Sequence, residues 1–169
     1  MTTSVRRATP ADAAAIAEVH GRSWQVAYRG IVPDDVLDGL SVVQRERVWA
    51  DLLARDDGGP LVLVGEHDGH VIGFCSALTQ GRDDPDHAEI TAIYVDPGHW
   101  RAGAGSALLG AALAELRAAH CAAVRLWVFA GNERALAFYR CFGFAADGAE
   151  MIDESSGRGE IRLRAPLPG

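Results

Sequence analysis

The most constraining feature of the chain is a junction at residues 95–109, where an apolar run ends, a turn of small residues follows and a helical pattern begins. The turn contains Gly103 and Gly105. A strand that enters a helix through glycine and alanine leaves several backbone N–H groups uncovered at the positive end of the helix dipole. The junction therefore predicts a strand–turn–helix unit that suits a bound pyrophosphate, and an anionic cofactor is the leading hypothesis.

Apolar periodicity and turn residues divide the rest of the chain into strands and helices. Strands are expected at residues 4–7, 61–66, 71–79, 89–95, 124–129, 149–153 and 160–167. Helices are expected at residues 10–24, from 33, after 41, at 103–120 and at 132–141. In the third of these, Val48, Leu52 and Leu53 are expected to share one buried face. Because hairpin strands come first and strand–helix–strand units follow, the pattern predicts an α/β fold with a mixed sheet and helices on both faces.

Length and composition bound the class of protein. The 169 residues suit one domain over residues 1–169, and a content of 49% apolar and 23% charged residues is typical of a globular chain. No apolar run approaches the roughly 20 residues of a membrane span, so no membrane partner is expected. The absence of a secretory pattern and the odd set Cys75, Cys121 and Cys141 predict a reduced, cytoplasmic protein. A net charge of −7 argues against non-specific nucleic-acid binding.

Single positions exclude two familiar phosphate-binding motifs. A P-loop needs a lysine at its seventh position, and counting from Gly98 that position holds Ala104. A dinucleotide-binding fingerprint needs a third glycine three residues after the second, and Leu108 stands there after Gly105. Neither a nucleotide triphosphatase nor a Rossmann enzyme is expected.

A third pattern fits the chain. An apolar strand and Pro97 precede Gly103-x-Gly105 at the start of an apolar helix, and downstream follows the motif Asn132-x-x-Ala135-x-x-Phe138-Tyr139-x-x-Phe142-Gly143-Phe144. This pattern resembles the GNAT superfamily of N-acetyltransferases, and the resemblance covers residues 3–167 in element order. It implies about seven strands, mostly antiparallel with a central parallel pair, about four flanking helices, and acetyl-CoA as cosubstrate.

The resemblance also implies a set of cofactor contacts. The family's turn begins with Arg or Gln, followed after two variable residues by the Gly-x-Gly/Ala pattern, whereas this chain has Trp100 at the first position. Main-chain groups of Ile93 and Val95 are expected to pair with the pantetheine arm like an added strand. The residues implied for cofactor binding are Ile93, Val95, Arg101, Ala102, Gly103, Ala104, Gly105, Ser106 and Asn132. The alternative is that Gly103 and Gly105 only permit close packing of helix and strand.

Tyr139 is the residue expected to carry chemistry. The family's equivalent tyrosine points its hydroxyl at the thioester sulfur. A leaving thiolate resembles cysteine, with a pKa of about 8.5 against about 10 for tyrosine, so complete proton transfer from Tyr139 is uphill by roughly 2 kcal/mol. We therefore expect a strong hydrogen bond to the thiolate. The alternative is a tyrosine that only packs between helix and sheet.

Glu89 is the candidate general base. A lysine-like amine of pKa about 10.4 costs roughly 4.6 kcal/mol to deprotonate at pH 7, so a base or a water relay is needed. Glu89 lies six residues before Val95, and this offset resembles that of the catalytic glutamate in histone-acetylating members. By alternation Glu89, Thr91, Ile93 and Val95 share one face unless a bulge intervenes. The alternatives are a solvated glutamate and a water relay.

His20, Trp24 and Tyr28 recur at steps of four and share a stripe if the first helix reaches Tyr28. In the family this region walls the acceptor site, so Trp24 and Tyr28 are candidate substrate residues that could hold an amine by cation–π contact. Core packing of Trp24 is the alternative. The histidines and cysteines lack the spacing of a zinc site, so no metal is expected.

Together these expectations describe an N-acetyltransferase that moves acetyl directly from acetyl-CoA to a primary amine of a small molecule, with the Val95 N–H facing the developing oxyanion. A protein or peptide acceptor and a non-catalytic acyl-CoA-binding module are the alternatives. Dimers are common in the family, so a homodimer is among the states that the resemblance implies.

Overall fold

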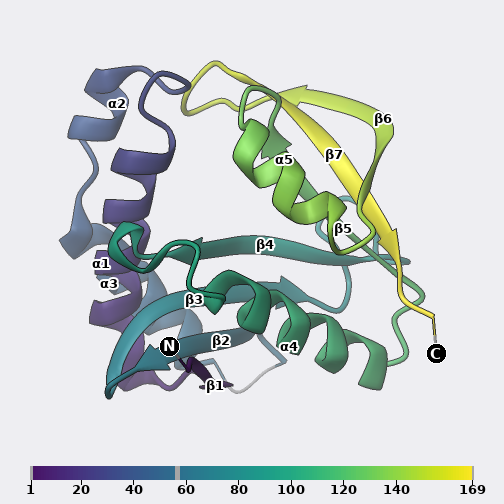
Figure 1. Ribbon diagram of the computed structural model, residues 1–169, viewed down its shortest axis with the longest axis horizontal. Helices are drawn as coiled ribbons and strands as arrows, with labels where there is room; N and C mark the ends of the chain where they lie inside the picture. The colour runs from purple at the N-terminus through teal and green to yellow at the C-terminus, as the bar shows by residue number, and fades with distance from the viewer. Residues whose placement is uncertain (1, 56–57, 169) are drawn as a thin grey trace.

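A mixed seven-stranded sheet forms the centre of the computed structural model, which describes residues 2–55 and 58–168 (Figure 1). The strand order is β1-β2-β3-β4-β5-β7-β6, and only β4 and β5 run parallel. The strands are β1 (Ser4–Arg7), β2 (Leu61–His67), β3 (His70–Leu78), β4 (Ala88–Val95), β5 (Ala123–Phe129), β6 (Ala145–Ile152) and β7 (Gly159–Pro166). The predicted mixed sheet with its central parallel pair is confirmed.

Helices cover both faces of this sheet. Helices α1 (Ala13–Ala27) and α3 (Val42–Leu53) pack on one face through a buried cluster that includes Phe74, and the short α2 (Asp34–Asp38) lies between them in the chain. Helices α4 (Ala104–Ala118) and α5 (Glu133–Arg140) cover the other face. The described residues thus hold five α-helices, which agrees with the five helical stretches predicted from the sequence, whereas the resemblance implied about four.

Two details of the elements differ from expectation. Val48 is 59% exposed, so the predicted face of Val48, Leu52 and Leu53 is wrong. The stripe that packs on the sheet runs through the buried Trp49 and the half-buried Leu52 and Leu53, one helical step away from Val48. Strand β6 also begins earlier than predicted, because Gly148 lies at a register shift inside the strand and not at a turn before it.

The parallel strands β4 and β5 separate soon after they meet. Their pairing is confined to Ala88 with Val124 and Glu89 with Arg125. Beyond these pairs the two halves of the sheet separate. Figure 1 shows β7, the strand paired with β5, moving away from β4 toward the left of the view. A gap between two parallel strands leaves unpaired backbone groups along both edges, which suits an extended ligand.

A β-bulge in β4 decides which face each of its residues joins. Ser76 pairs with Ala92 and Ala77 pairs with Ile90, so Thr91 is an extra residue without its own partner. Ile90, Ile93 and Val95 consequently pack on the α4 side. Alternation then puts Glu89, the neighbour of Ile90, on the α1 side. The prediction that Glu89 shares a face with Ile93 and Val95 is therefore wrong, and the bulge is the reason.

Candidate active site

The splay between β4 and β5 holds a cavity of about 880 Å³. It collects side chains and backbone from both sides of the sheet. Most of the predicted site residues line it, namely Trp24, Tyr28, Glu89, Ile93, Val95, Arg101, Gly103, Gly105, Ser106, Asn132 and Tyr139. Ala102 and Ala104 do not line it, and Ala104 is buried in the first turn of α4.

The turn before α4 has the backbone shape of an anion cradle. Arg101 and Gly103 both have positive φ, of 61° and 88°. Within residues 2–55 and 58–168, no hydrogen bond is formed by the backbone N–H groups of residues 101–106. They lie at the N-terminus of a 15-residue helix, where N–H groups lack helical partners and the dipole is positive. The cradle therefore fits a pyrophosphate.

Close packing does not explain the two glycines. A Cβ atom at Gly103 would meet nothing within 4 Å, so this position needs glycine for its left-handed backbone. A Cβ atom at Gly105 would lie 3.5 Å from Cζ of Phe138, an ordinary contact distance. The structure thus favours the cradle over the packing-only alternative, while a larger side chain at Gly105 would enter the cavity that this residue lines.

Trp100, at the family's usual Arg or Gln position, braces the turn. Its indole Nε1 donates to the carbonyl oxygen of Val95 at 2.7 Å. The Arg134 guanidinium carbon lies 3.5 Å from the centre of the Trp100 ring, which is a cation–π contact. Burial, and then the charge of Arg101, lower the pKa of Arg134. Two arginines thus stand beside the uncovered N–H groups.

The free edge of β4 faces the gap. The backbone N–H of Asp96 donates to the carbonyl of Ile72 in β3 at 2.8 Å. Successive residues of a strand point their N–H groups to opposite sides, so the N–H groups of Val95 and Ile93 face away from β3. The Val95 carbonyl accepts from Trp100 and from the Ser23 hydroxyl at 3.0 Å, while its N–H has no such partner.

Tyr139 lies on α5, which begins at Asn132. The Asn132 side chain accepts from the backbone N–H of Ala135 at 3.2 Å and so caps the helix. Tyr139 is 9% exposed, yet it lines the cavity. Burial raises the pKa of Tyr139 well above its usual range. Among the described residues its hydroxyl has no hydrogen-bond partner, so a protonated hydroxyl is free to donate into the cavity.

The sequence of the chain matches the model of the acetyltransferase (GNAT) family over residues 22–144. The chain belongs to the GNAT family of acetyltransferases. It is 31% identical to an uncharacterized N-acetyltransferase, YuaI, of Bacillus subtilis, over 82% of this chain and 78% of that protein. The fold matches the PaiA N-acetyltransferase of Thermoplasma acidophilum in complex with coenzyme A, with a TM-score of 0.82 and 20% identity over 98% and 99% of the two chains. It also matches yncA of Salmonella typhimurium with acetyl-CoA, with a TM-score of 0.74 and 23% identity over 100% and 96%.

In this GNAT chain Glu89 is buried and paired rather than solvated. The residue is only 6% exposed. One carboxylate oxygen accepts from the backbone N–H of Arg82 at 2.9 Å, and the other accepts from the Arg82 guanidinium at 2.6 and 3.2 Å. Both oxygens are therefore engaged before any substrate arrives.

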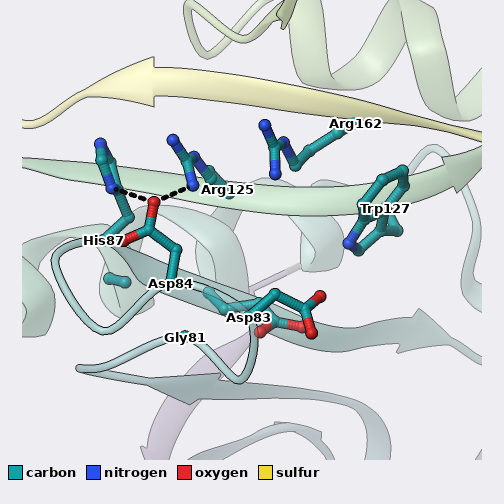
Figure 2. Close-up of a pocket in the computed structure, with 9 residues that line it drawn as sticks. Gly81, Asp83, Asp84, His87, Arg125, Trp127 and Arg162 are labelled. Carbon is teal, nitrogen blue, oxygen red and sulfur yellow. Dashed lines mark hydrogen bonds and ion pairs between the residues drawn. The ribbon is translucent and has the colours of Figure 1, made fainter. Parts of the chain in front are cut away.

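A second, small cavity explains how the loop that carries Arg82 is held. Figure 2 shows Asp84 between His87 and Arg125, whose side chains both reach its carboxylate. The space beside them is about 20 Å³, which is room for a water molecule and not for a substrate. The contacts of Asp84 with His87 and Arg125 therefore hold the loop, which also carries Arg82, against the start of β5.

Aromatic residues at the end of α1 line one side of the cavity. The helix ends at Ala27 with Tyr28 as its C-cap, so the predicted stripe of His20, Trp24 and Tyr28 is present. The Trp24 and Tyr28 rings lie 4.9 Å apart at 85°, and the Tyr28 and Tyr94 hydroxyls are 3.1 Å apart. Both aromatic residues also pack on a buried cluster, so Trp24 is at once a core residue and a wall of the cavity.

The sequence interpretation missed several lining residues. Arg45, Tyr94, Arg134 and Glu160 all line the cavity, from four different elements. Arg134 lies within the predicted motif, two residues after Asn132, at a position where the motif specifies no residue type. The others carry no motif. Across the described part of the chain, no group of three His, Cys, Asp or Glu could hold a metal ion, and no helix is long and apolar enough to cross a bilayer.

Proposed function

We propose that this GNAT acetyltransferase binds acetyl-CoA at the α4 cradle and transfers the acetyl group directly to a primary amine of a small molecule. The observation that carries the proposal is the turn before α4, where Arg101, Gly103, Gly105 and Ser106 line the same cavity as Tyr139 and Arg134 and their backbone N–H groups form no hydrogen bond with the described residues. Similar solved structures contain coenzyme A and acetyl-CoA, which supports the choice of ligand.

Different residues of the chain would bind different parts of acetyl-CoA. The N–H groups of the turn residues that line the cavity, Arg101, Gly103, Gly105 and Ser106, would hold the pyrophosphate together with the guanidinium of Arg134. The edge of β4 at Ile93 and Val95 would pair with the pantetheine amides. When bound, acetyl-CoA supplies an activated acetyl thioester. Holding this thioester and an amine in one cavity removes about 7–11 kcal/mol of the barrier by orientation alone.

We assign two groups to the stabilisation of charge during transfer. The Val95 N–H faces the gap and would meet the oxygen that gains negative charge. Tyr139 would donate a hydrogen bond to the leaving thiolate. Because burial raises the pKa of Tyr139, giving up its proton completely is even less favourable than for a free tyrosine, so the hydrogen bond is the contribution we assign to it.

Glu89 is our proposed route for the proton of the amine, acting through an intervening water. Direct abstraction would require the pair with Arg82 to open, since that arginine occupies both carboxylate oxygens. A water bound to the outer face of the carboxylate leaves the pair intact and can relay the proton.

The aromatic wall supports a small acceptor over a protein chain. Trp24, Tyr28 and Phe129 surround the acceptor side with ring centroids 4.9–6.4 Å apart. A wall of packed aromatic rings suits a small amine, whereas a protein substrate needs a groove for an extended segment.

Binding and turnover test the proposal separately. Calorimetry on the purified protein should show uptake of acetyl-CoA, and an amine panel should release free CoA thiol. Gly105→Val places a branched side chain in the cradle, and we expect the Kd for acetyl-CoA to rise about tenfold or more. Gly110→Val is the matched control, because the same substitution lies in the same helix outside the cavity.

Three results would contradict the proposed function. The first is wild-type protein that does not bind acetyl-CoA, and the second is a Gly105→Val variant that binds it with unchanged Kd. Either result would refute the turn before α4 as the binding site. Uptake without thiol release for any amine would favour the non-catalytic module.

A further inference from the structure

Arg45 is a cation on the acceptor side of the cavity that has no counter-ion. It lies on α3, is half-buried and lines the cavity. Within residues 2–55 and 58–168 it forms no ion pair, whereas Arg82 in the same cavity pairs with Glu89 at 2.6 Å. Its guanidinium instead contacts His20, with Nη1 3.1 and 2.9 Å from the two ring nitrogens, and stands 5.3 Å from the Trp24 ring centre.

His20 does not neutralise this charge. Burial, and then the charge of Arg45, lower the pKa of His20 to about 3, so the ring is neutral at pH 7. Its Nδ1 also accepts from the Trp49 indole at 3.3 Å. Burial lowers the pKa of Arg45 as well, which marks the cost of removing a cation from water without an anion beside it. An anionic ligand would recover part of that cost.

Arg45 cannot serve the phosphate groups of the cofactor. It belongs to α3, on the face of the sheet opposite α4, whereas the cradle and Arg134 belong to the α4 and α5 face. The other arginines of the cavity without an ion pair, Arg101 and Arg134, already stand at the cradle. The positive charge of Arg45 is therefore available to bind a group of the acceptor.

Glu160 gives the same side of the cavity an anion. It lies in β7, is half-buried and lines the cavity, and its carboxylate forms no hydrogen bond or ion pair with the described residues. Burial, and then the charge of Asp153, raise the pKa of Glu160, while Arg82 lowers it. Asp153 is held by the hydroxyls of Ser155 and Ser156 at 2.7 and 2.6 Å. Tyr94 lines the same cavity as Arg45 and Glu160, and its ring stacks on His20 with the ring centroids 5.0 Å apart.

We propose that the acceptor is an amine that also carries an oxyanion such as a carboxylate, with Arg45 binding the oxyanion and Glu160 facing the amine. This inference rests on the proposed function and narrows it to amino acids and related amino oxyanions. A guanidinium matches a carboxylate with two parallel N–H donors, and a phosphonate offers the same oxygens.

Matched pairs of acceptors test the inference. Each amino acid of a panel is compared with the amine left by removing its carboxylate and with the corresponding aminophosphonate, at saturating acetyl-CoA. We expect kcat/KM of the wild type to be at least about tenfold higher for members that carry an oxyanion, in line with a hydrogen-bonded charge. The ratio of carboxylate to phosphonate then identifies which oxyanion the site prefers.

Variants separate the two ends of the acceptor. Arg45→Gln should raise KM for the amino acid about tenfold and leave KM for the decarboxylated amine and for acetyl-CoA unchanged. Arg45→Lys should restore part of the loss. Glu160→Gln should weaken both members of a pair equally, because both carry the amine. Arg47→Gln is the control, since Arg47 is exposed on the same helix and does not line the cavity.

Two results would overturn the inference while acetyl transfer itself stands. One is equal kcat/KM for an amino acid and its decarboxylated partner in the wild type. The other is an Arg45→Gln variant that changes both partners by the same factor. A protein that takes up no acetyl-CoA in calorimetry would instead remove the proposed function, and this inference with it.

Discussion

At the scale of single residues, Tyr139 and Glu89 show how burial changes what a side chain can do. Tyr139 is buried on α5 without a hydrogen-bond partner among the described residues, so its hydroxyl stays protonated and ready to donate. Glu89 is buried too, but Arg82 occupies both of its oxygens. The Tyr139 hydroxyl is thus free to donate into the cavity, whereas both oxygens of Glu89 already accept hydrogen bonds.

Tyr139→Phe should lower kcat by about 10- to 100-fold, the value of one hydrogen bond to a charged atom, and leave KM for acetyl-CoA nearly unchanged. Because the pKa of Tyr139 is raised, no loss of activity from its ionisation is expected below about pH 10. Steady-state kinetics against pH check both statements. Wild-type turnover in the variant would assign Tyr139 to packing.

Glu89→Gln should lower kcat/KM at pH 7 by about 100-fold, and the deficit should shrink as the pH approaches about 10.4, where a lysine-like amine loses its proton unaided. The pH profiles of variant and wild type, measured with one amine, give the comparison. A deficit of the same size at every pH would mean that Glu89 serves only to hold Arg82 and the loop of Figure 2.

At the scale of elements, the cradle depends on contacts between two helices and a strand. The turn before α4 presents Trp100, whose indole binds the end of β4 and whose ring carries Arg134 from α5. A tryptophan at the usual Arg or Gln position thus does not remove a cation from the cradle, because the cation comes from the next helix.

Trp100→Ala and Arg134→Ala should each raise KM for acetyl-CoA about tenfold with kcat within about twofold. Since Trp100 acts partly by placing Arg134, the double variant should lose less than the product of the two single effects. Arg140→Ala, exposed at the end of α5, is the control. Fully independent effects of the two residues would show that the stacked pair does not act as a unit.

At the scale of the whole molecule, the sheet separates two tasks. Its α4 and α5 face holds the cradle, its α1 and α3 face holds the aromatic wall with Arg45, and the splay of β4 from β5 joins them in one cavity. The buried, neutral His20 beside these aromatic residues also makes the free energy of unfolding depend on pH.

Acid should destabilise the fold through His20. Its pKa falls from 6.5 to about 3 on folding, so above pH 6.5 both states are neutral and the group has no effect. Between these values only the unfolded state binds the proton, so the free energy of unfolding falls as the pH falls, by at most about 1.4 kcal/mol per pH unit. Asp12, with a folded pKa of about 2 against 3.8, adds a further loss as the pH falls from 3.8 to about 2. Urea denaturation of wild type and His20→Gln at several pH values checks this, and equal slopes between pH 6.5 and 4 would refute it.

The sequence alone determined the elements and the cradle, because both follow from local physics. Left-handed glycines, helix caps at Ser41 and Asn132, and the Asp68-Gly69 turn act within a few residues of where they stand. The strand and helix assignments therefore agree with the structure except at boundaries such as β6, where a glycine at a bulge resembles a turn.

Only the tertiary structure decided the charges and faces of the site. The bulge at Thr91, which moved Glu89 to the other face, depends on pairing with β3. The partners Trp100 with Arg134, and Arg45 with His20, are 34 and 25 positions apart in the sequence. Distances of this kind come from packing around a shared core, which no local pattern encodes. On the α1 side of the cavity the sequence accordingly predicted only the aromatic residues Trp24 and Tyr28, and it missed Arg45, Tyr94 and Glu160, which come from three other elements.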